Sequence, residues 1–219
     1  MLARKRILIA DDHPLLREGL MQFINRQENL ICCAESDSAA STFTAVQQHK
    51  PDLLLLDLRL RNEDGLELIK FLKGQYPELL ILVISQCDET IYAERALRAG
   101  ARGYIMKEEA SDKVLAAISA VLSGEIYLSR KMALRLAERS IECRATGAGP
   151  GVESLTDREL QVFQLLGSGL TTRQIAAKMN LSFKTIETYR ENIKHKLGLA
   201  GAAELVRCAT SWIESGPST

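Results

Sequence analysis

The first 125 residues alternate short apolar runs with segments of helical periodicity, and this alternation limits the possible folds more than any other feature of the chain. Residues 53–56 are four consecutive leucines, a pattern typical of a strand buried on both faces. Five strand–helix units with short connections indicate an α/β fold with a doubly wound, five-stranded parallel sheet, as in flavodoxin-like proteins. The expected strands are 6–12, 30–36, 52–58, 79–85 and 103–107, and the expected helices are 14–27, 38–49, 65–76, 89–100 and 110–124.

The remainder of the chain is predicted to be helical. Residues 128–145 carry apolar side chains at helical spacing among basic ones, and residues 146–154 (TGAGPGVES) have the composition of a flexible linker. We therefore expect a first domain at 1–124, a partly helical linker at 125–150 and an all-α domain at 151–219.

Capping residues mark the helix boundaries of the last domain. Thr156 is followed three residues later by Glu159, which is a capping box, and Ser182 is a natural N-cap. Asn180 and Gly198 suit the left-handed conformation that ends a helix. A short helix, a tight turn and a longer basic helix predict a helix-turn-helix. The expected helices lie within 154–169, 171–180, 182–198 and 201–216.

Charge is unevenly distributed along a chain whose formal net charge is zero. Residues 1–125 hold 15 basic and 19 acidic side chains, whereas residues 173–196 hold six basic and two acidic ones. A basic segment within the helical domain fits either nucleic-acid binding or a solvated helix face, and charge alone leaves both open.

Cysteine usage and hydropathy predict a cytoplasmic protein without a membrane partner. The five cysteines are odd in number and form no C-x-x-C pair, so we expect buried free thiols in a reducing compartment. The apolar run after the basic N-terminus is too short for a signal peptide, and no run approaches the roughly 18–20 apolar residues of a membrane span.

Carboxylates stand at the ends of two predicted strands. The first strand ends on Asp11 and Asp12, and the leucine run is followed by Asp57. Ligands bind beyond the carboxyl ends of strands in such sheets, and these two strands are expected to be neighbours, so the three acids should converge. Clustered carboxylates repel one another unless a cation is bound, and carboxylate oxygens suit octahedral Mg²⁺.

A hydroxyl and an ammonium group complete this set. The fourth strand ends on Ser85 and the fifth on Lys107. Three acids, a hydroxyl and a lysine suit phosphoryl transfer to a carboxylate, because a metal and the lysine neutralise phosphoryl oxygens while the hydroxyl donates to one of them.

Two sets of motifs resemble known families. The segments ILIADDHPLLREGL, PDLLLLDL, LVIS and GARGYIMK resemble the receiver domain of bacterial two-component response regulators. The segment LTDRELQVFQLLGSGLTTRQIAAKMNLSFKTIETYRENIKHKLGL resembles the LuxR-type helix-turn-helix. Both sets occur in the order found in the NarL/FixJ class, so the resemblance covers nearly the whole chain.

The resemblance implies roles for individual residues. Asp57 would be the phosphoacceptor, Asp11 and Asp12 would hold Mg²⁺ together with Asp57, and the backbone carbonyl of Arg59 would be a further metal ligand. Ser85 and Lys107 would contact the phosphoryl group, and Tyr104 would rotate when Ser85 is recruited.

The resemblance also implies partners. A sensor histidine kinase would donate the phosphoryl group, and the phosphorylated chain would bind double-stranded DNA as a homodimer to regulate transcription, with RNA polymerase as a candidate partner. The exposed face of the helix in 201–216 often forms the dimer contact in the family. Apart from its own phosphoryl transfer and autodephosphorylation, the chain is not expected to be an enzyme.

The chain departs from the family pattern near the acceptor. Leu60-Arg61 stand where Met-Pro is frequent, which leaves the acceptor intact but can alter the following loop and the autodephosphorylation rate. Glu108 stands where proline often follows the lysine, so no cis peptide bond is assumed there. His13 beside the acids is a candidate metal ligand, but Pro14 suits a first helical turn and makes this the weaker interpretation.

The longer basic helix has one apolar side and one polar side. Ile186, Tyr189, Ile193 and Leu197 form the expected buried stripe. The resemblance implies that the polar side faces DNA. There, cationic side chains suit phosphate or guanine, and a carboxylate can accept a hydrogen bond from cytosine N4. The expected outward residues are Lys184, Thr185, Glu187, Thr188, Arg190, Glu191, Lys194 and His195, and all but His195 are predicted DNA contacts.

Several alternatives remain open. Taken singly, Asp57 could be a loop cap, Ser85 a simple strand end and Tyr104 a core aromatic. An aspartyl phosphatase would need a second acid where Arg59 stands, and a ligand-sensing LuxR regulator would not need the acidic cluster. A nucleotide-binding dehydrogenase is disfavoured because no G-x-G-x-x-G or P-loop motif occurs.

Overall fold

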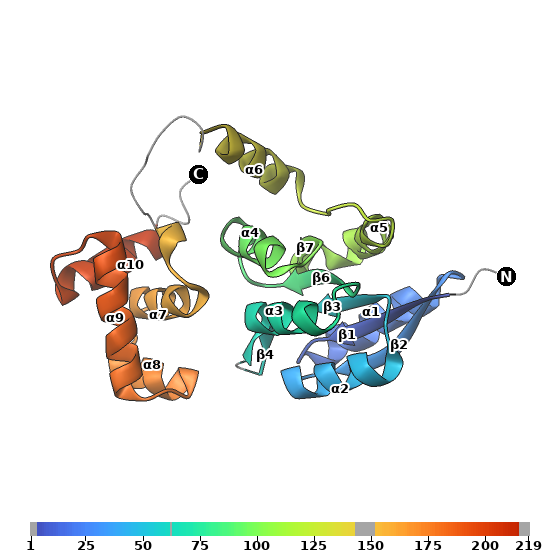
Figure 1. Ribbon diagram of the computed structural model, residues 1–219, viewed down its shortest axis with the longest axis horizontal. Helices are drawn as coiled ribbons and strands as arrows, with labels where there is room; N and C mark the ends of the chain where they lie inside the picture. The colour runs from blue at the N-terminus through green and yellow to red at the C-terminus, as the bar shows by residue number, and fades with distance from the viewer. Residues whose placement is uncertain (1–3, 62, 143–151, 215–219) are drawn as a thin grey trace. The chain divides into compact units, whose positions relative to one another are not determined.

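The computed structural model describes residues 4–61, 63–142 and 152–214 (Figure 1). The chain divides into two compact units, Met1–Glu142 and Cys143–Thr219. Residues 146–151 of the predicted flexible segment 146–154 lie outside the described residues, and its last three residues form the 3₁₀ helix η2 (Val152–Ser154).

The first unit contains the predicted five-stranded parallel sheet. Its strands lie in the order β2-β1-β3-β6-β7, and every pairing is parallel. β1 and β3 are therefore neighbours, as the convergence of the acids requires. The strands are β1 (Lys5–Ala10), β2 (Leu30–Ser36), β3 (Leu53–Leu56), β6 (Leu80–Ser85) and β7 (Gly103–Met106).

Helices cover both faces of this sheet because strand side chains alternate between the faces. One set of strand residues, including Ile7 and Leu55, forms a buried core with α1 (Pro14–Asn25) and α5 (Ala110–Leu122). The helices α2, α3 and α4 lie on the opposite face of the sheet (Figure 1). Their bounds are α2 (Ala39–His49), α3 (Gly65–Gln75) and α4 (Glu89–Ala99).

A small antiparallel hairpin after β3 was not predicted. It pairs β4 (Arg59–Leu60) with β5 (Glu63–Asp64), and Arg61 has a positive φ of 48°. The Arg61 guanidinium forms an ion pair with Asp37, and the Glu63 carboxylate accepts from the N–H of Ala39. This hairpin occupies the place where the family often has Met-Pro, and it is tied to the start of α2.

The chain beyond α5 stays attached to the first unit. Tyr127 donates its N–H to the carbonyl of Arg102 at 3.0 Å and accepts from the N–H of Tyr104 at 2.9 Å, which is a parallel bridge to the outer edge of β7. The helix predicted at 128–145 is α6 (Arg130–Glu142), and it packs on α4 with Met132 buried.

The second unit is helical, as predicted. Its helices are α7 (Asp157–Gly167), α8 (Thr172–Met179), α9 (Phe183–Leu197) and α10 (Ala202–Glu214). Thr156 and Glu159 form the predicted capping box, and Ser182 caps α9 through the N–H of Thr185. Asn180 and Gly198 adopt the left-handed conformation at the ends of α8 and α9.

Two further expectations concern cysteines and membrane spans. Cys32, Cys33, Cys87 and Cys208 are free, as predicted, but only Cys87 among these four is buried, and Cys143 lies outside the described residues. Burial raises the pKa of the Cys32 thiol to about 11. Among the described helices, none has the length and apolar character needed to cross a bilayer.

Candidate functional site

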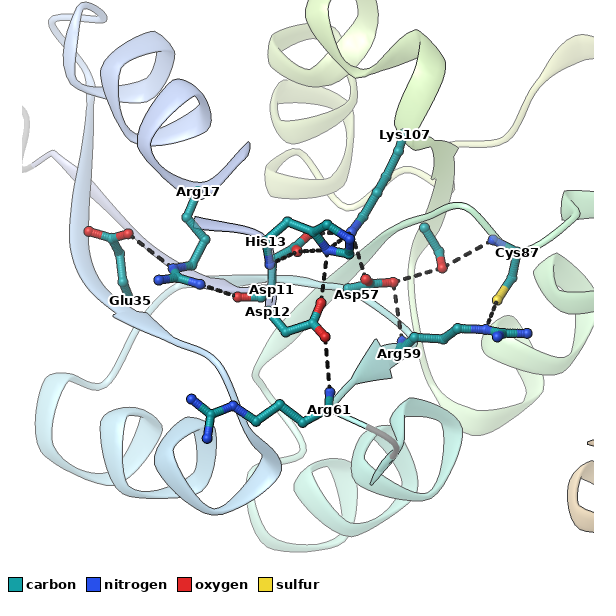
Figure 2. A network of polar contacts seen from close by, with 11 residues as sticks. Asp11, Asp12, His13, Arg17, Glu35, Asp57, Arg59, Arg61, Cys87 and Lys107 are labelled. Atoms are coloured by element: carbon teal, nitrogen blue, oxygen red, sulfur yellow. Dashed lines mark hydrogen bonds and ion pairs between the residues drawn. The ribbon is translucent and has the colours of Figure 1, made fainter. Parts of the chain in front are cut away.

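Four strands deliver the predicted pocket residues to one edge of the sheet. Asp11 follows β1 and Asp57 follows β3, and the N–H of Asp57 still donates to the carbonyl of Ala10 at 2.8 Å. Ser85 is the last residue of β6, and Lys107 directly follows β7. Figure 2 shows the acids and Lys107 pointing toward one another from these separate elements.

Asp57 lies at the centre of the pocket. Its side chain is almost fully buried, and its Oδ1 accepts from the Ser85 hydroxyl at 2.8 Å and from the N–H of Arg59 at 3.2 Å. Its Oδ2 accepts from the Lys107 ammonium at 2.6 Å. A buried carboxylate is costly unless it is paired and hydrogen-bonded, and both oxygens of Asp57 have such partners.

Lys107 also contacts the second buried acid. Its ammonium lies 2.7 Å from Asp11 Oδ2, and the side chain is only 6% exposed. Burial alone would lower the pKa of Lys107, but the hydrogen bonds and charges of Asp11 and Asp57 raise it above its ordinary value. The lysine therefore carries a positive charge that two buried carboxylates share.

The arrangement of the acids fits a divalent cation. Asp11, Asp12, His13 and Asp57 each offer a ligand atom, and these atoms lie within 4.8 Å of one another. Asp12 Oδ1 is buried and has no hydrogen-bond donor among the described residues, although His13 Nδ1 lies 2.8 Å away. Several carboxylate oxygens within this distance of one another are what a hard cation would bind, so the residues fit Mg²⁺.

His13 is closer to the acids than sequence reasoning favoured. Its Nδ1 also lies 2.9 Å from Asp11 Oδ1 and 3.2 Å from the Lys107 ammonium. The backbone of His13 nevertheless serves as the N-cap of α1, with Pro14 in the first turn as expected. In the sequence, this proximity was indicated by the place of His13 directly after Asp11 and Asp12.

Three arginines surround the pocket, and two of them were not predicted (Figure 2). Arg17 donates to the carbonyl oxygen of Asp11 at 2.6 Å, and the N–H of Arg61 donates to Asp12 Oδ2 at 3.2 Å. Arg59, expected to contribute a carbonyl oxygen, extends its guanidinium toward Cys87, with Nε 3.3 Å from Sγ.

Tyr104 lies in the interior beneath the pocket. Its side chain is buried, and its hydroxyl donates to the carbonyl oxygen of Cys87 at 2.6 Å. The N–H of Cys87 in turn donates to the Ser85 hydroxyl at 3.3 Å. Burial raises the pKa of Tyr104 far above its ordinary value, so the ring stays neutral. The short backbone segment 85–87 thus connects the Ser85 hydroxyl, which contacts Asp57, to Tyr104, the aromatic side chain predicted to rotate.

The second candidate site is helix α9. Ile186 and Ile193 are fully buried, whereas Tyr189 and Leu197 of the expected stripe are half-buried. The exposed outward residues follow one another at helical spacing along one ridge of the helix, and Asn192 lies beside them. This ridge consists of Lys184, Thr188, Glu191 and His195.

The outward carboxylates of α9 are paired with cations one turn later. Glu187 accepts from Arg190 at 2.9 Å, and Glu191 forms an ion pair with Lys194 at 2.8 Å. Arg190 and Lys194 are half-buried rather than fully exposed, and Thr185 takes part in capping the helix. The cations nearest the middle of the helix are thus engaged within the protein.

Lys196 was counted in the basic segment but points inward. Its ammonium lies 2.6 Å from the buried Glu159 carboxylate of α7. Burial alone would raise the pKa of Glu159, but hydrogen bonds from Lys196 and Thr156 hold it below its ordinary value. This pair fixes α9 against α7.

Family comparisons cover both units of the chain. Residues 7–119 match the response regulator receiver domain, and residues 153–209 match the bacterial regulatory proteins of the luxR family. Four of the five candidate pocket positions lie at strand ends within the first match, and α9 lies within the second.

Individual relatives extend over nearly the whole chain. The oxygen regulatory protein NreC of Staphylococcus aureus is 33% identical over 209 residues, which are 93% of this chain and 96% of NreC. RcsB of Salmonella enterica, solved on a promoter with the phosphomimetic BeF₃⁻, is 25% identical, with a TM-score of 0.66, and the match covers 95% of this chain and 99% of RcsB.

A third match is a two-component response regulator of the LuxR family from Aurantimonas. It is 29% identical, with a TM-score of 0.59, and covers 64% of this chain and 99% of that one. Together with the receiver and luxR matches, these relatives show that the chain belongs to the response regulators that join a receiver domain to a LuxR-type DNA-binding domain.

Proposed function

We propose that a sensor histidine kinase phosphorylates this response regulator on Asp57, and that the phosphorylated chain binds DNA as a dimer in the cytoplasm to regulate transcription. We assign residues 1–124 to the receiver domain, 125–150 to the linker and 151–219 to the DNA-binding domain. The observation that carries the proposal is that Asp57 contacts both the Ser85 hydroxyl and the Lys107 ammonium.

Asp11, Asp12 and Asp57 would hold Mg²⁺, with the carbonyl oxygen of Arg59 as a further ligand. The ion would neutralise charge on the phosphoryl oxygens when bound. The clustering of these oxygens supports this assignment, because ligand atoms of Asp11, Asp12 and Asp57 lie within 4.8 Å of one another, and such carboxylates repel one another unless a cation is bound.

The transfer step follows from these contacts. A carboxylate oxygen of Asp57 would form a bond to phosphorus while the bond from phosphorus to the donor histidine nitrogen breaks and the imidazole leaves. Lys107 and Ser85, which now contact Asp57, would bind two phosphoryl oxygens as the charge moves outward. The same groups would serve autodephosphorylation, with water as the acceptor.

Recruitment of Ser85 by the phosphoryl group would change the backbone that Tyr104 contacts. The Ser85 hydroxyl accepts from the N–H of Cys87, whose carbonyl holds the Tyr104 hydroxyl. Loss of these bonds would let Tyr104 rotate, and a phosphoryl dianion can shift the equilibrium only through such contacts that differ between states.

Phosphorylation is tested by incubation of the full chain with a small phosphodonor and Mg²⁺, followed by intact-mass measurement. We expect one added phosphoryl group in the wild type and none in Asp57→Asn. Asp52→Asn, which changes an aspartate at the opposite end of β3, is the matched control and should be labelled normally. Labelling of Asp57→Asn, or full labelling in excess chelator, contradicts the assignment.

Dimerisation is tested with BeF₃⁻ and Mg²⁺ as the phosphoryl mimic. We expect the mimic to raise both the dimer fraction in sedimentation and the affinity for a duplex selected by the protein from a random pool. Val206 and Ile213 on α10 are exposed apolar side chains on the expected contact face, so Val206→Glu should lower the dimer fraction. Equal dimer fraction and equal affinity with and without the mimic would disprove this part of the proposal.

A further inference from the structure

The two outward carboxylates of α9 differ in how they are held. Among the described residues, Glu191 is paired only with Lys194, which is three residues away on the same helix. Glu187 is paired with Arg190, whose Nη1 lies 2.9 Å from Glu187 Oε1 and 2.5 Å from the hydroxyl oxygen of Thr172 on α8. Arg190 therefore connects the outward carboxylate to the other helix of the helix-turn-helix.

The two ion pairs, Glu187–Arg190 and Glu191–Lys194, also differ in how exposed their carboxylates are. The Arg190 side chain is 17% exposed, and Thr172 is buried in the first turn of α8. The Glu191 side chain is 67% exposed, whereas that of Glu187 is 40% exposed. A guanidinium that two partners hold in a partly buried place loses less freedom on binding than a free surface cation.

We propose that Thr172 and Arg190 are positioning residues for base recognition: they hold the Glu187 carboxylate in one orientation toward the major groove. This inference rests on the proposed DNA binding and on the predicted DNA contact of Glu187, which we take to be a contact to a base edge. It assigns Arg190 a task other than the phosphate contact expected from its charge.

The geometry gives each atom a separate task. Arg190 holds Oε1 of Glu187, so Oε2 is left for a donor on a base, such as cytosine N4. The adjacent guanidinium also compensates the carboxylate charge, which would otherwise be repelled by DNA phosphates. A carboxylate fixed before binding does not lose side-chain entropy when the base pairs with it.

The test uses the full chain and a duplex selected by the wild type from a random pool, with a scrambled duplex for comparison. Thr172→Val removes the hydroxyl but keeps the shape of the side chain. We expect its preference for the selected over the scrambled duplex to fall by about 2- to 10-fold, which is the cost of ordering one free side chain. Thr172→Ser keeps the hydroxyl and should restore the preference.

The salt dependence of binding separates positioning from phosphate contact. Arg190→Gln should reduce the preference at one base pair while the slope of log affinity against log salt stays unchanged. Lys194→Ala is the matched control on the same helix and should lower that slope by about one with the preference unchanged. In a Glu187→Ala background, Thr172→Val should have no further effect on the preference, because its target is gone.

The possible outcomes are distinct. If Arg190→Gln lowers the salt slope by about one and Thr172→Val keeps full preference, Arg190 is a phosphate contact and the inference is wrong. The fluorescence of Trp212, the single tryptophan, reports whether each variant's DNA-binding unit is folded. If the wild type enriches no duplex, the proposed function itself fails, and this result is recognisable before any variant is compared.

Discussion

The acidic pocket and the outer face of α9 use charge in opposite ways. In the pocket, the charged groups come from strand ends far apart in the sequence, and Asp11, Asp57 and Lys107 are nearly buried. On α9, the ion pairs are local, three residues apart, and their carboxylates are much more exposed. The sheet therefore creates the first arrangement, whereas helical periodicity creates the second.

This difference predicts different costs of mutation. A charge removed from the pocket leaves buried partners uncompensated, which costs much more than the loss of a surface pair. Removal of a charge from the outer face of α9 should change the affinity or the sequence preference for DNA and leave the fold intact. The following experiments test this contrast.

The largest effect is expected for Lys107→Ala. This change removes the cation that contacts both Asp57 and Asp11 and that would stabilise the transferring phosphoryl group. We expect the rate of phosphorylation by a small phosphodonor to fall by about 10²-fold, as for other preorganised donors. The rate is measured by intact mass over time at saturating Mg²⁺.

Lys113→Ala is the matched control for that experiment. Lys113 forms an ion pair with Glu109 on the surface of α5 at 2.7 Å, away from the acids. Its removal should leave the phosphorylation rate unchanged. A similar loss of rate in both variants would show that receiver stability, rather than the position of Lys107, limits the reaction.

An intermediate effect is expected for Glu159→Gln, the buried carboxylate of the DNA-binding unit. The change keeps the shape but weakens the bonds to Lys196 and Thr156, so we expect a loss of about 1–3 kcal/mol in the free energy of unfolding at neutral pH. Urea denaturation followed by Trp212 fluorescence reports the unfolding of this unit, because Trp212 packs against Phe163 with their ring centroids 5.7 Å apart.

The pH dependence of this effect has a definite sign. The pKa of Glu159 is lower in the folded than in the unfolded state, so its contribution is fully present above the ordinary glutamate pKa. It is lost as pH falls through the lowered folded pKa. The stability difference between wild type and Glu159→Gln should therefore shrink in acid, and a difference that is independent of pH would contradict the ionised pair.

The smallest effect on DNA binding is expected from two lysines of α9, of which Lys194 lies on the outward side and Lys196 points toward α7. Lys194→Ala should weaken binding to every duplex a few-fold and lower the salt slope by about one, because we predict a phosphate contact for Lys194. Lys196→Ala should leave the salt slope unchanged and lower the stability instead, since Lys196 pairs with Glu159. DNA titrations at two or more salt concentrations distinguish the two variants. Equal salt slopes for Lys194→Ala and Lys196→Ala would contradict the different roles assigned to these lysines.

The sequence predicted that β1 and β3 are neighbours and that the pocket residues converge, because both expectations depend on strong local patterns. The leucine run before Asp57 and the acids after β1 marked strand ends, and a parallel sheet brings neighbouring ends together. Capping at Thr156 and Asn180 was also predictable, since each signal lies within a few residues of the feature it sets.

Other features could not be predicted because they depend on contacts between distant or weakly patterned segments. The β4–β5 hairpin has two-residue strands, which are too short to show a period. The bond from Arg190 to Thr172 joins residues 18 positions apart, and helical periodicity alone places Arg190 at the edge of the polar side. Lys196 was counted as part of a basic surface although its partner is buried on another helix.

The bridge from Tyr127 to β7 determines where the chain can be divided. β7 is an edge strand of the sheet, and Tyr127 occupies the carbonyl of Arg102 and the N–H of Tyr104 on its open side. A fragment that stops at residue 124 would leave both groups unpaired, and an uncovered edge strand invites pairing with another molecule. A receiver fragment prepared for crystallisation or NMR should therefore extend through α6, and the shorter fragment is expected to self-associate.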